Sequence, residues 1–281
     1  MERPQDVYTE VMDVVIRKVE HDSKHSDDDE VREYASLWLG KIDRNIVKRP
    51  VMTLPYGVKL YGIKDQIVNE LRKRDIDYLG SDDPYKPSMY LAKVLWESIG
   101  EVVIASRQAM DWLQEVASVV SSTESAISWV TPAGFLVHQR YNMTVAKSIR
   151  TFWGEARVRV QLAMNHEDTK IDKMRQRNGI SPNFVHSMDA SHLMLTINRL
   201  KGGGINSFSS VHDSYGTHAC DIDHLNRTLR EAFVEQYSKD VLEDFKDQLL
   251  SQTTKSIELP AMPQKGQLEL GTVIDSPYFF A

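Results

Sequence analysis

Apolar residues recur at helical spacing along most of the chain, and these stretches predict a largely helical protein. Residues 4–20 carry an apolar stripe and start at a proline, which suits the first turn of a helix. A helix starting at Ser181-Pro182 is expected to end at three consecutive glycines, 202–204. Further helices are expected over residues 60–74, 88–120, 223–237 and 241–250. Two polar stretches, 22–31 and 81–87, are expected to be loops.

One more helix is expected to begin near Val31 and to run to about residue 57. Pro50 and Pro55 each remove a hydrogen bond from it, so its end is expected to be kinked or unravelled. Residues four apart stack along one helical face. On this helix the stack consists of Arg44, Lys48, Met52 and Tyr56.

Three stretches show the shorter periodicity of strands. Residues 127–130 and 135–138 predict a β-hairpin around Thr-Pro-Ala-Gly. Residues 141–165 include the alternation Arg-Val-Arg-Val at 157–160, which predicts a β-ribbon with one basic edge and one apolar edge.

The stretch 207–220 predicts two short strands that meet at a turn formed by His212-Asp213-Ser214. Residues typical of a half-buried pleated surface flank this turn, and Gly216 permits a sharp bend. The flanking residues are Val211, Tyr215, Thr217 and Cys220.

Composition is that of an ordinary globular protein: of 281 residues, 41% are hydrophobic and 26% charged. A single cysteine, Cys220, excludes an intrachain disulfide framework. No apolar run reaches membrane-spanning length, and the first residues do not resemble a secretory leader. A soluble cytoplasmic protein without a membrane partner is therefore expected.

A net charge of −6, taken alone, disfavours nucleic acid as a partner, but the distribution of charge matters more than its sum. Basic residues concentrate over 41–49 and again over 140–177. Two basic patches on an acidic body are compatible with a phosphate-binding cleft.

Asp213 is the first candidate for a Mg²⁺ ligand. A carboxylate at a tight bend projects from a rigid hairpin, and small hard cations take oxygen ligands, including one or two carboxylates. The alternative is that aspartate is simply a common turn residue.

The stack on the 31–57 helix is a second candidate site. Arg44 and Lys48 could grip a triphosphate, with Tyr56 against the sugar, because arginine offers a bidentate fork and lysine a compact charge. The alternative is a solvated basic face. His186, expected in the first turn of the Pro182 helix, could donate to a ligand hydroxyl, but pairing with Asp189 is the favoured interpretation.

Three ordered motifs carry a family resemblance. They are Lys48-Arg-Pro-Val-Met-Thr-Leu-Pro-Tyr-Gly57, Pro182-Asn-Phe-Val-His-Ser-Met-Asp189 and Val211-His-Asp-Ser-Tyr-Gly-Thr217. Together with 129–135 and the closing Tyr-Phe-Phe-Ala281, they closely resemble the last third of the single-subunit DNA-directed RNA polymerases of the T-seven phage and mitochondrial type. The resemblance covers essentially the whole chain.

The resemblance implies an α+β, mainly helical fold that forms the fingers and late palm of a right-hand polymerase. Residues 1–180 would be the fingers portion, with a nucleotide-binding helix over about 31–57 and a specificity ribbon over about 141–165. Residues 181–281 would be the late palm, with a metal-binding hairpin at 207–220 and a C-terminal tail. If the chain is phage-encoded, the host cytoplasm is its expected location.

The resemblance also implies roles for individual residues in template-directed ribonucleotidyl transfer. Asp213 would bind catalytic Mg²⁺, with His212 beside the metal. Tyr56 would help select ribose, and His186 would recognise the ribose hydroxyl. The residues implied in binding the incoming ribonucleoside triphosphate are Arg44, Lys48, Arg49, Met52, Tyr56, Gly57, His186 and His212.

The ribbon would read promoter DNA, which makes Arg150, Arg157 and Arg159 candidates for base contacts in the major groove. Nascent RNA is an implied partner as well. The last residues, Phe280 and Ala281, would pack near the active site.

Two-metal phosphoryl transfer takes more than one carboxylate, and the family supplies its second from a motif upstream of Met1. Asp189 is assigned to a separate helical motif, so half an active site is expected, together with a protein partner that supplies the rest. Two alternatives remain: a non-catalytic fragment that binds DNA or nucleotides, and, more remotely, a metal phosphohydrolase that uses His212-Asp213. The phosphohydrolase would place this pair on a helix among several histidine ligands.

Overall fold

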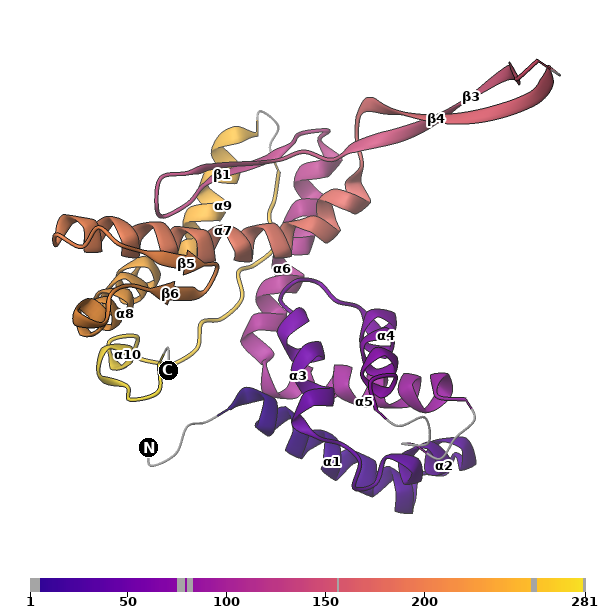
Figure 1. The fold of residues 1–281 in the computed structure, drawn as a ribbon, viewed down its shortest axis with the longest axis horizontal. Helices are drawn as coiled ribbons and strands as arrows, with labels where there is room; N and C mark the ends of the chain where they lie inside the picture. Colours follow the sequence, from indigo (N-terminus) through magenta and orange to yellow (C-terminus); the bar gives the residue numbers. More distant parts are fainter. Residues whose placement is uncertain (1–5, 75–78, 80–82, 156, 254–256, 280–281) are drawn as a thin grey trace. The chain divides into compact units, whose positions relative to one another are not determined.

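The computed structural model describes residues 6–74, 79, 83–155, 157–253 and 257–279. These residues form a mainly helical chain with three separate two-stranded antiparallel sheets (Figure 1). The chain divides into two compact units. Unit 1 comprises residues 1–111 and 263–266, and unit 2 comprises residues 112–262 and 267–281. The division by function at residue 180 stays a prediction.

Among the residues of unit 1 that the structure describes, every regular element is a helix (Figure 1). They are α1 (Val7–His25), α2 (Asp29–Trp38), α3 (Arg44–Thr53), α4 (Leu60–Leu71), α5 (Tyr85–Val102) and the start of α6 (Ile104–Ser122).

The helix expected over 31–57 is in fact two helices. The chain leaves α2 through Gly40, whose φ of +68° favours glycine, and Asp43 then caps α3 by accepting from the backbone N–H groups of Asn45 and Ile46. Pro50 does not interrupt α3, which continues through this residue to Thr53, but the chain then unravels into turns over 54–57, as expected for the end of this helix. Tyr56 lies beyond the end of α3, in the following turn.

Other helix boundaries also differ from the expected ones. α1 continues into the polar stretch to His25, and α2 begins at Asp29, so most of 22–31 is helical. Residues 85–87, expected in a loop, form the first turn of α5. The helix expected over 88–120 breaks at Val103, which has non-helical backbone angles, between α5 and α6.

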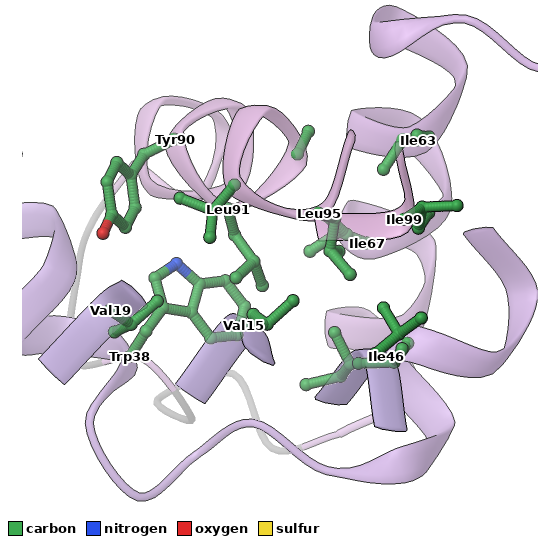
Figure 2. Packing of buried hydrophobic residues seen from close by; sticks show 14 of the residues in the cluster. Val15, Val19, Trp38, Ile46, Ile63, Ile67, Tyr90, Leu91, Leu95 and Ile99 are labelled. Carbon is green, nitrogen blue, oxygen red and sulfur yellow. The ribbon is translucent and has the colours of Figure 1, made fainter. Parts of the chain in front are cut away.

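The apolar faces of these helices meet in one core (Figure 2). Trp38 is fully buried there, and its indole N–H donates to the carbonyl of Pro87 at 2.9 Å, so the ring contributes apolar area without an unpaired donor. Tyr90 donates to Asp22 at 2.8 Å, which ties α5 to α1. Other residues of this core include Val15, Val19, Ile46, Ile63, Ile67, Leu91, Leu95 and Ile99.

Unit 2 contains the rest of α6, all three sheets and the remaining helices. The strands are β1 (Ile127–Val130), β2 (Leu136–Gln139), β3 (Asn142–Trp153), β4 (Val158–Ile171), β5 (Ser209–Val211) and β6 (Ser214–Gly216). The helices are α7 (Lys173–Gly202), α8 (Ile222–Ser238), α9 (Val241–Gln252) and α10 (Thr272–Asp275), with a 3₁₀ turn at Ala219–Asp221. The expected 127–138 hairpin is confirmed, and so is the ribbon expected over 141–165, although its second strand extends to Ile171.

Helix α7 begins earlier than expected. Asp172 caps it by accepting from the backbone N–H of Arg175, and Pro182 lies inside the helix rather than in its first turn. His186 is therefore a mid-helix residue. The expected end at the glycines was right, because α7 stops at Gly202.

The β3–β4 ribbon has two chemically different faces, because directly opposed residues share a face and successive residues alternate. Arg150 opposes Gln161, and Phe152 opposes Arg159, so the two arginines share the more polar face. The opposite face carries Val145, Ile149, Trp153, Val158, Val160, Leu162 and Met164. Trp153 on that face is 72% exposed. The expected alternation is confirmed over 158–160, but Arg157 lies in the turn with a φ of +47°.

The base of the ribbon is fixed to α7 by buried amides. Gln139 donates to the side-chain oxygen of Gln176 at 2.9 Å, and Gln176 donates to the backbone carbonyl of Gln139 at 3.0 Å. Asn183 donates to Gln139 at 2.8 Å and to the Tyr141 hydroxyl at 3.1 Å. A Cβ at Gly179 would lie 2.7 Å from the Tyr141 ring, so glycine permits this approach.

Helix α8 holds the segment around α10 through Arg230, which is only 7% exposed. Its guanidinium donates to the backbone carbonyls of Val273 at 3.1 Å and Phe279 at 2.6 Å, and also to that of Ser276. The Phe279 ring packs on Phe233 with centroids 4.9 Å apart. Phe280 and Ala281, expected near the active site, lie outside the described residues.

Within the described part of the chain, no helix combines the length and apolarity needed to cross a lipid bilayer.

Candidate active site

The tip of the β5–β6 hairpin carries Asp213. Val211 pairs with Ser214, so His212 and Asp213 form a two-residue turn; the turn is where the sequence indicated, but Ser214, expected in it, begins β6. His212 has a φ of +53°, in the left-handed region that is costly for residues other than glycine. Strain of this kind persists only where the surroundings enforce it, and it is common at functional sites.

The strands of this hairpin are shorter than expected. Residues 217–220, expected to continue the second strand, lie outside it, and Ala219–Asp221 forms a 3₁₀ turn. Val211 and Cys220, expected to be half-buried, are exposed, whereas Tyr215 and Thr217 are half-buried as predicted. The reason is that β5 and β6 pair only over three residues each, so only the side chains that face the helices find cover.

Asp213 is exposed and lines an open hollow of about 520 Å³ between the hairpin and α8. The other residues lining this hollow are Ser214, Tyr215, Ile222, Leu225, Asn226 and Leu229. A more enclosed cavity of about 250 Å³, lined in part by Trp129, Phe184 and Phe245, contains none of the predicted site residues. The carboxylate of Asp213 is thus accessible to a cation or a substrate.

Helix α7 brings Asp189 into electrostatic range of the hairpin. Partial burial of its carboxyl raises the pKa of Asp189, although the residue as a whole is exposed. Electrostatic interaction with His186 acts to lower the pKa of Asp189, and the negative charge of Asp213 raises it further. The assignment of Asp189 to a separate motif was therefore incomplete, because folding places its charge near that of Asp213.

His186 and Asp189 are three residues apart on α7, so they are neighbours on one helical face. His212 also acts electrostatically on Asp189. Asp189 is thus linked electrostatically to His186 on its own helix and to His212 and Asp213 of the hairpin, so that two separate sequence motifs interact.

The chemistry of these donors determines how well they could hold a divalent cation. Asp213 offers an exposed carboxylate, which suits a hard cation such as Mg²⁺. Within the described residues, no group of three or more His, Cys, Asp or Glu side chains is arranged to hold a metal ion. Asp213 fits the role of one ligand, and Mg²⁺ commonly completes its shell with water and phosphate oxygens.

The cationic residues on α3 belong to unit 1. Arg44, Lys48, Arg49 and Met52 are all exposed. Arg44 is engaged by α1, because its Nε lies 2.5 Å from the Asp6 carboxylate and its guanidinium lies 5.0 Å from the centroid of the Tyr8 ring. Partial burial acts to raise the pKa of Asp6, but hydrogen bonding and the charge of Arg44 outweigh it, so the pKa is lowered.

Tyr56 is 40% exposed and follows α3 rather than lying on it, so the four-residue stack holds for the three earlier members only. Gly57 follows with a φ of +79°. The turn carries the tyrosine beyond the helix and is hydrogen-bonded to its end, because the backbone N–H groups of Tyr56 and Val58 both donate to the carbonyl of Thr53 at 3.2 Å.

Tyr215 and His192 belong to this site, although sequence reasoning gave them no role in it. The Tyr215 hydroxyl lies 3.1 Å from Nδ1 of His192, and Nε2 of His192 lies 2.9 Å from the carbonyl oxygen of Leu229. His192 is only 5% exposed, and its contacts join three elements, α7, α8 and β6. The only signal in the sequence that could have pointed to His192 is its place on the same helix as His186, six residues further along.

Comparisons with known proteins identify the family to which the chain belongs. A family model for DNA-dependent RNA polymerase matches residues 1–259. The chain is 38% identical over 283 residues to DNA-directed RNA polymerase 2, chloroplastic/mitochondrial, of Arabidopsis thaliana. The match covers 99% of this chain and 27% of that protein. The chain is also 38% identical to the chloroplastic polymerase 3 of Nicotiana sylvestris, covering 28% of it.

DNA-directed RNA polymerase 2A of Nicotiana tabacum is 37% identical over 283 residues, and the match covers 99% of this chain and 82% of that protein. Against the longer relatives, the chain spans little more than a quarter of their length. With a family model matching residues 1–259 and this degree of identity, the chain belongs to the family of DNA-dependent RNA polymerases.

Proposed function

We propose that this chain is the C-terminal catalytic portion of a single-subunit DNA-directed RNA polymerase, comprising fingers and late palm. It would act in template-dependent ribonucleotidyl transfer. The observation that carries the proposal is the exposed Asp213 at a strained hairpin tip, within electrostatic range of Asp189 and beside an open hollow. Family membership supports the reaction type.

Asp213 would hold a divalent cation, which we infer to be Mg²⁺ because the available donor is a carboxylate oxygen. When bound, such an ion lowers the cost of developing negative charge on the transferring phosphoryl group. His212 and His186 are proposed to lie beside the nucleotide, with His186 donating to a ribose hydroxyl. Other ligands of the cation would come from a part of the polymerase that the longer relatives contain and that this chain does not match.

The α3 face in unit 1 is proposed to bind the triphosphate. Lys48 and Arg49 are exposed and ready to contact phosphate. Arg44 would exchange its Asp6 partner for phosphate, since both are oxyanions that suit a guanidinium fork. Met52, Tyr56 and Gly57 would border the base and sugar.

The ribbon is proposed to contact promoter DNA through Arg150 and Arg159, with Arg157 at its turn. The arginines share one face, and arginine can bind guanine edges bidentately. Template DNA, ribonucleoside triphosphates and nascent RNA are the proposed partners, together with a polypeptide that completes the polymerase.

The test combines the chain with the polymerase portion of a longer relative, promoter DNA, nucleotides and Mg²⁺. Asp213→Asn keeps the shape of the side chain but removes its charge, so RNA synthesis should fall by about a thousandfold or more, as expected when a metal-mediated contribution of several kcal/mol is lost. The matched control is Asp247→Asn, an exposed aspartate on α9 in the same unit, which should leave synthesis unchanged.

Undiminished transcription by Asp213→Asn would exclude the role given to this residue. Salt-sensitive DNA binding without synthesis under every complementation would instead select the non-catalytic fragment. The phosphohydrolase alternative is not supported, since His212 and Asp213 lie in a hairpin turn rather than on a helix.

A further inference from the structure

His192 lies at the junction of three elements. It belongs to α7, its Nε2 is 2.9 Å from the Leu229 carbonyl of α8, and its Nδ1 is 3.1 Å from the Tyr215 hydroxyl of β6. The ring also packs edge-on against Phe233, with centroids 5.6 Å apart. Only 5% of the residue is exposed, so these contacts form in a dry environment, where hydrogen bonds are stronger and more costly to lose.

The partners of His192 determine its tautomer. A backbone carbonyl can only accept, so Nε2 must carry the proton and donate to Leu229. In the neutral ring Nδ1 is then an acceptor, and the Tyr215 hydroxyl donates to it. Burial lowers the pKa of His192 and raises the pKa of Tyr215 to about 12, which keeps both groups neutral near pH 7.

Tyr215 is the central residue of β6 and lies two positions after Asp213. The β5–β6 hairpin has only three pairs of residues, and an isolated two-stranded hairpin is marginally stable in water. Tyr215 also packs against the small cluster of Leu200, Ile205 and Leu225. The hydroxyl adds a directional contact to this apolar packing, which by itself would allow the short hairpin to slide or rotate.

We propose that His192 is a positioning residue for Asp213, because it fixes the β5–β6 hairpin against α7 and α8 through Tyr215. The catalytic meaning of this link rests on the function proposed above for Asp213. A carboxylate displaced by about 1 Å can cost a hundredfold in rate, so a single hydrogen bond at the foot of the turn can matter for the chemistry.

Three variants separate the two hydrogen bonds of His192. Tyr215→Phe keeps the ring and removes only the hydroxyl. His192→Asn places a side-chain oxygen close to the position of Nδ1, where it can still accept from Tyr215. His192→Gln places an amide close to the position of Nε2, where it can donate to Leu229 but cannot accept from Tyr215.

The first measurement is hydrogen exchange of the whole 281-residue chain, resolved to the peptide that spans 207–218. A net hydrogen bond of about 1 kcal/mol corresponds to roughly five-fold faster exchange, which we expect for Tyr215→Phe and His192→Gln in this peptide alone. His192→Asn should exchange close to the wild-type rate there. Imidazole ¹⁵N spectra of the wild type should show His192 protonated on Nε2 only.

Unchanged hairpin exchange in Tyr215→Phe would overturn the proposal. So would equal acceleration across α7, α8 and the hairpin, because that result indicates general loosening. These measurements need no catalysis, so Tyr215→Phe keeps the proposal falsifiable even if a His192 variant does not fold.

The second measurement is nucleotide addition by the complemented polymerase. Tyr215→Phe and His192→Gln should lower kcat and raise the Mg²⁺ concentration needed for half-maximal rate, with KM for nucleotide little changed and with recovery in His192→Asn. Loss of kcat without this pattern of rescue would contradict positioning. If Asp213→Asn still synthesises RNA, the proposed function fails and so does the catalytic meaning of the link, whatever the exchange data show.

Discussion

The β5–β6 hairpin and the β3–β4 ribbon are both two-stranded antiparallel sheets, yet they are stabilised in opposite ways. The hairpin is three residue pairs long, has a strained turn, and is held by side chains of α7 and α8. The ribbon is long, exposes both faces along most of its length, and is fixed at its base by buried amides. The hairpin suits the placement of one carboxylate, whereas the ribbon suits the presentation of a surface.

The largest expected change is in the free energy of unfolding, and it concerns the base of the ribbon. Gln176→Leu removes the side-chain donor to the buried backbone carbonyl of Gln139 and one of two acceptors for the Gln139 amide, and we expect a loss of about 2 kcal/mol in the free energy of unfolding. Urea unfolding of the chain provides the measurement. The control, Gln161→Leu, breaks an exposed bond to Ser148 on the ribbon itself and should change stability by less than about 0.5 kcal/mol. Equal losses in the two variants would contradict the distinction between base and exposed ribbon.

The next effect concerns the surface that the ribbon presents. Arg150 and Arg159 are diagonal neighbours on one face, so their joint replacement by alanine should weaken promoter binding by about tenfold or more. Stability should barely change, because both side chains are exposed. Fluorescence anisotropy with promoter DNA at several salt concentrations measures the affinity and its salt slope. Lys147→Ala, on the opposite face, is the matched control, and equal weakening there would exclude a face-specific contact.

The smallest effect concerns the strain at the hairpin tip. His212→Gly removes the cost of a positive φ and should stabilise the chain by roughly 1 kcal/mol, while His212→Ala should not. Thermal unfolding distinguishes the two. A glycine variant that is more stable but slower in RNA synthesis would show that the strain is retained for function. A glycine variant without any gain would mean that the turn is not strained.

Much of the site could be predicted from sequence because its information is local. The motif 211–217 places Asp213 at a turn, and glycines 202–204 mark the end of α7. Local signals also existed where the prediction was wrong: Gly40 and Asp43 mark the end of α2 and the cap of α3. The regular four-residue spacing through Tyr56 outweighed them.

Other features depend on tertiary contacts that sequence spacing does not express. Pro182 indicated a helix start, but Asp172 caps α7 ten residues earlier and the helix accommodates the proline in its interior. The Tyr215–His192 hydrogen bond joins residues 23 apart in sequence and depends on how the hairpin docks on α7. The electrostatic influence of Asp213 on Asp189 has the same origin, since each motif taken alone gives no sign of the other.

Arg230 gives the segment around α10 an importance that its irregular backbone does not suggest. The guanidinium that α8 contributes is almost fully buried, and its acceptors are backbone carbonyl oxygens within residues 273–279. If that segment detached, the guanidinium would lose these acceptors, and a charge left buried without acceptors costs several kcal/mol unless α8 also loosens and admits water, so the two changes should be coupled. Proteolytic nicking between α9 and α10 should therefore weaken the helix that borders the Asp213 hollow, although the cut lies far from it in sequence.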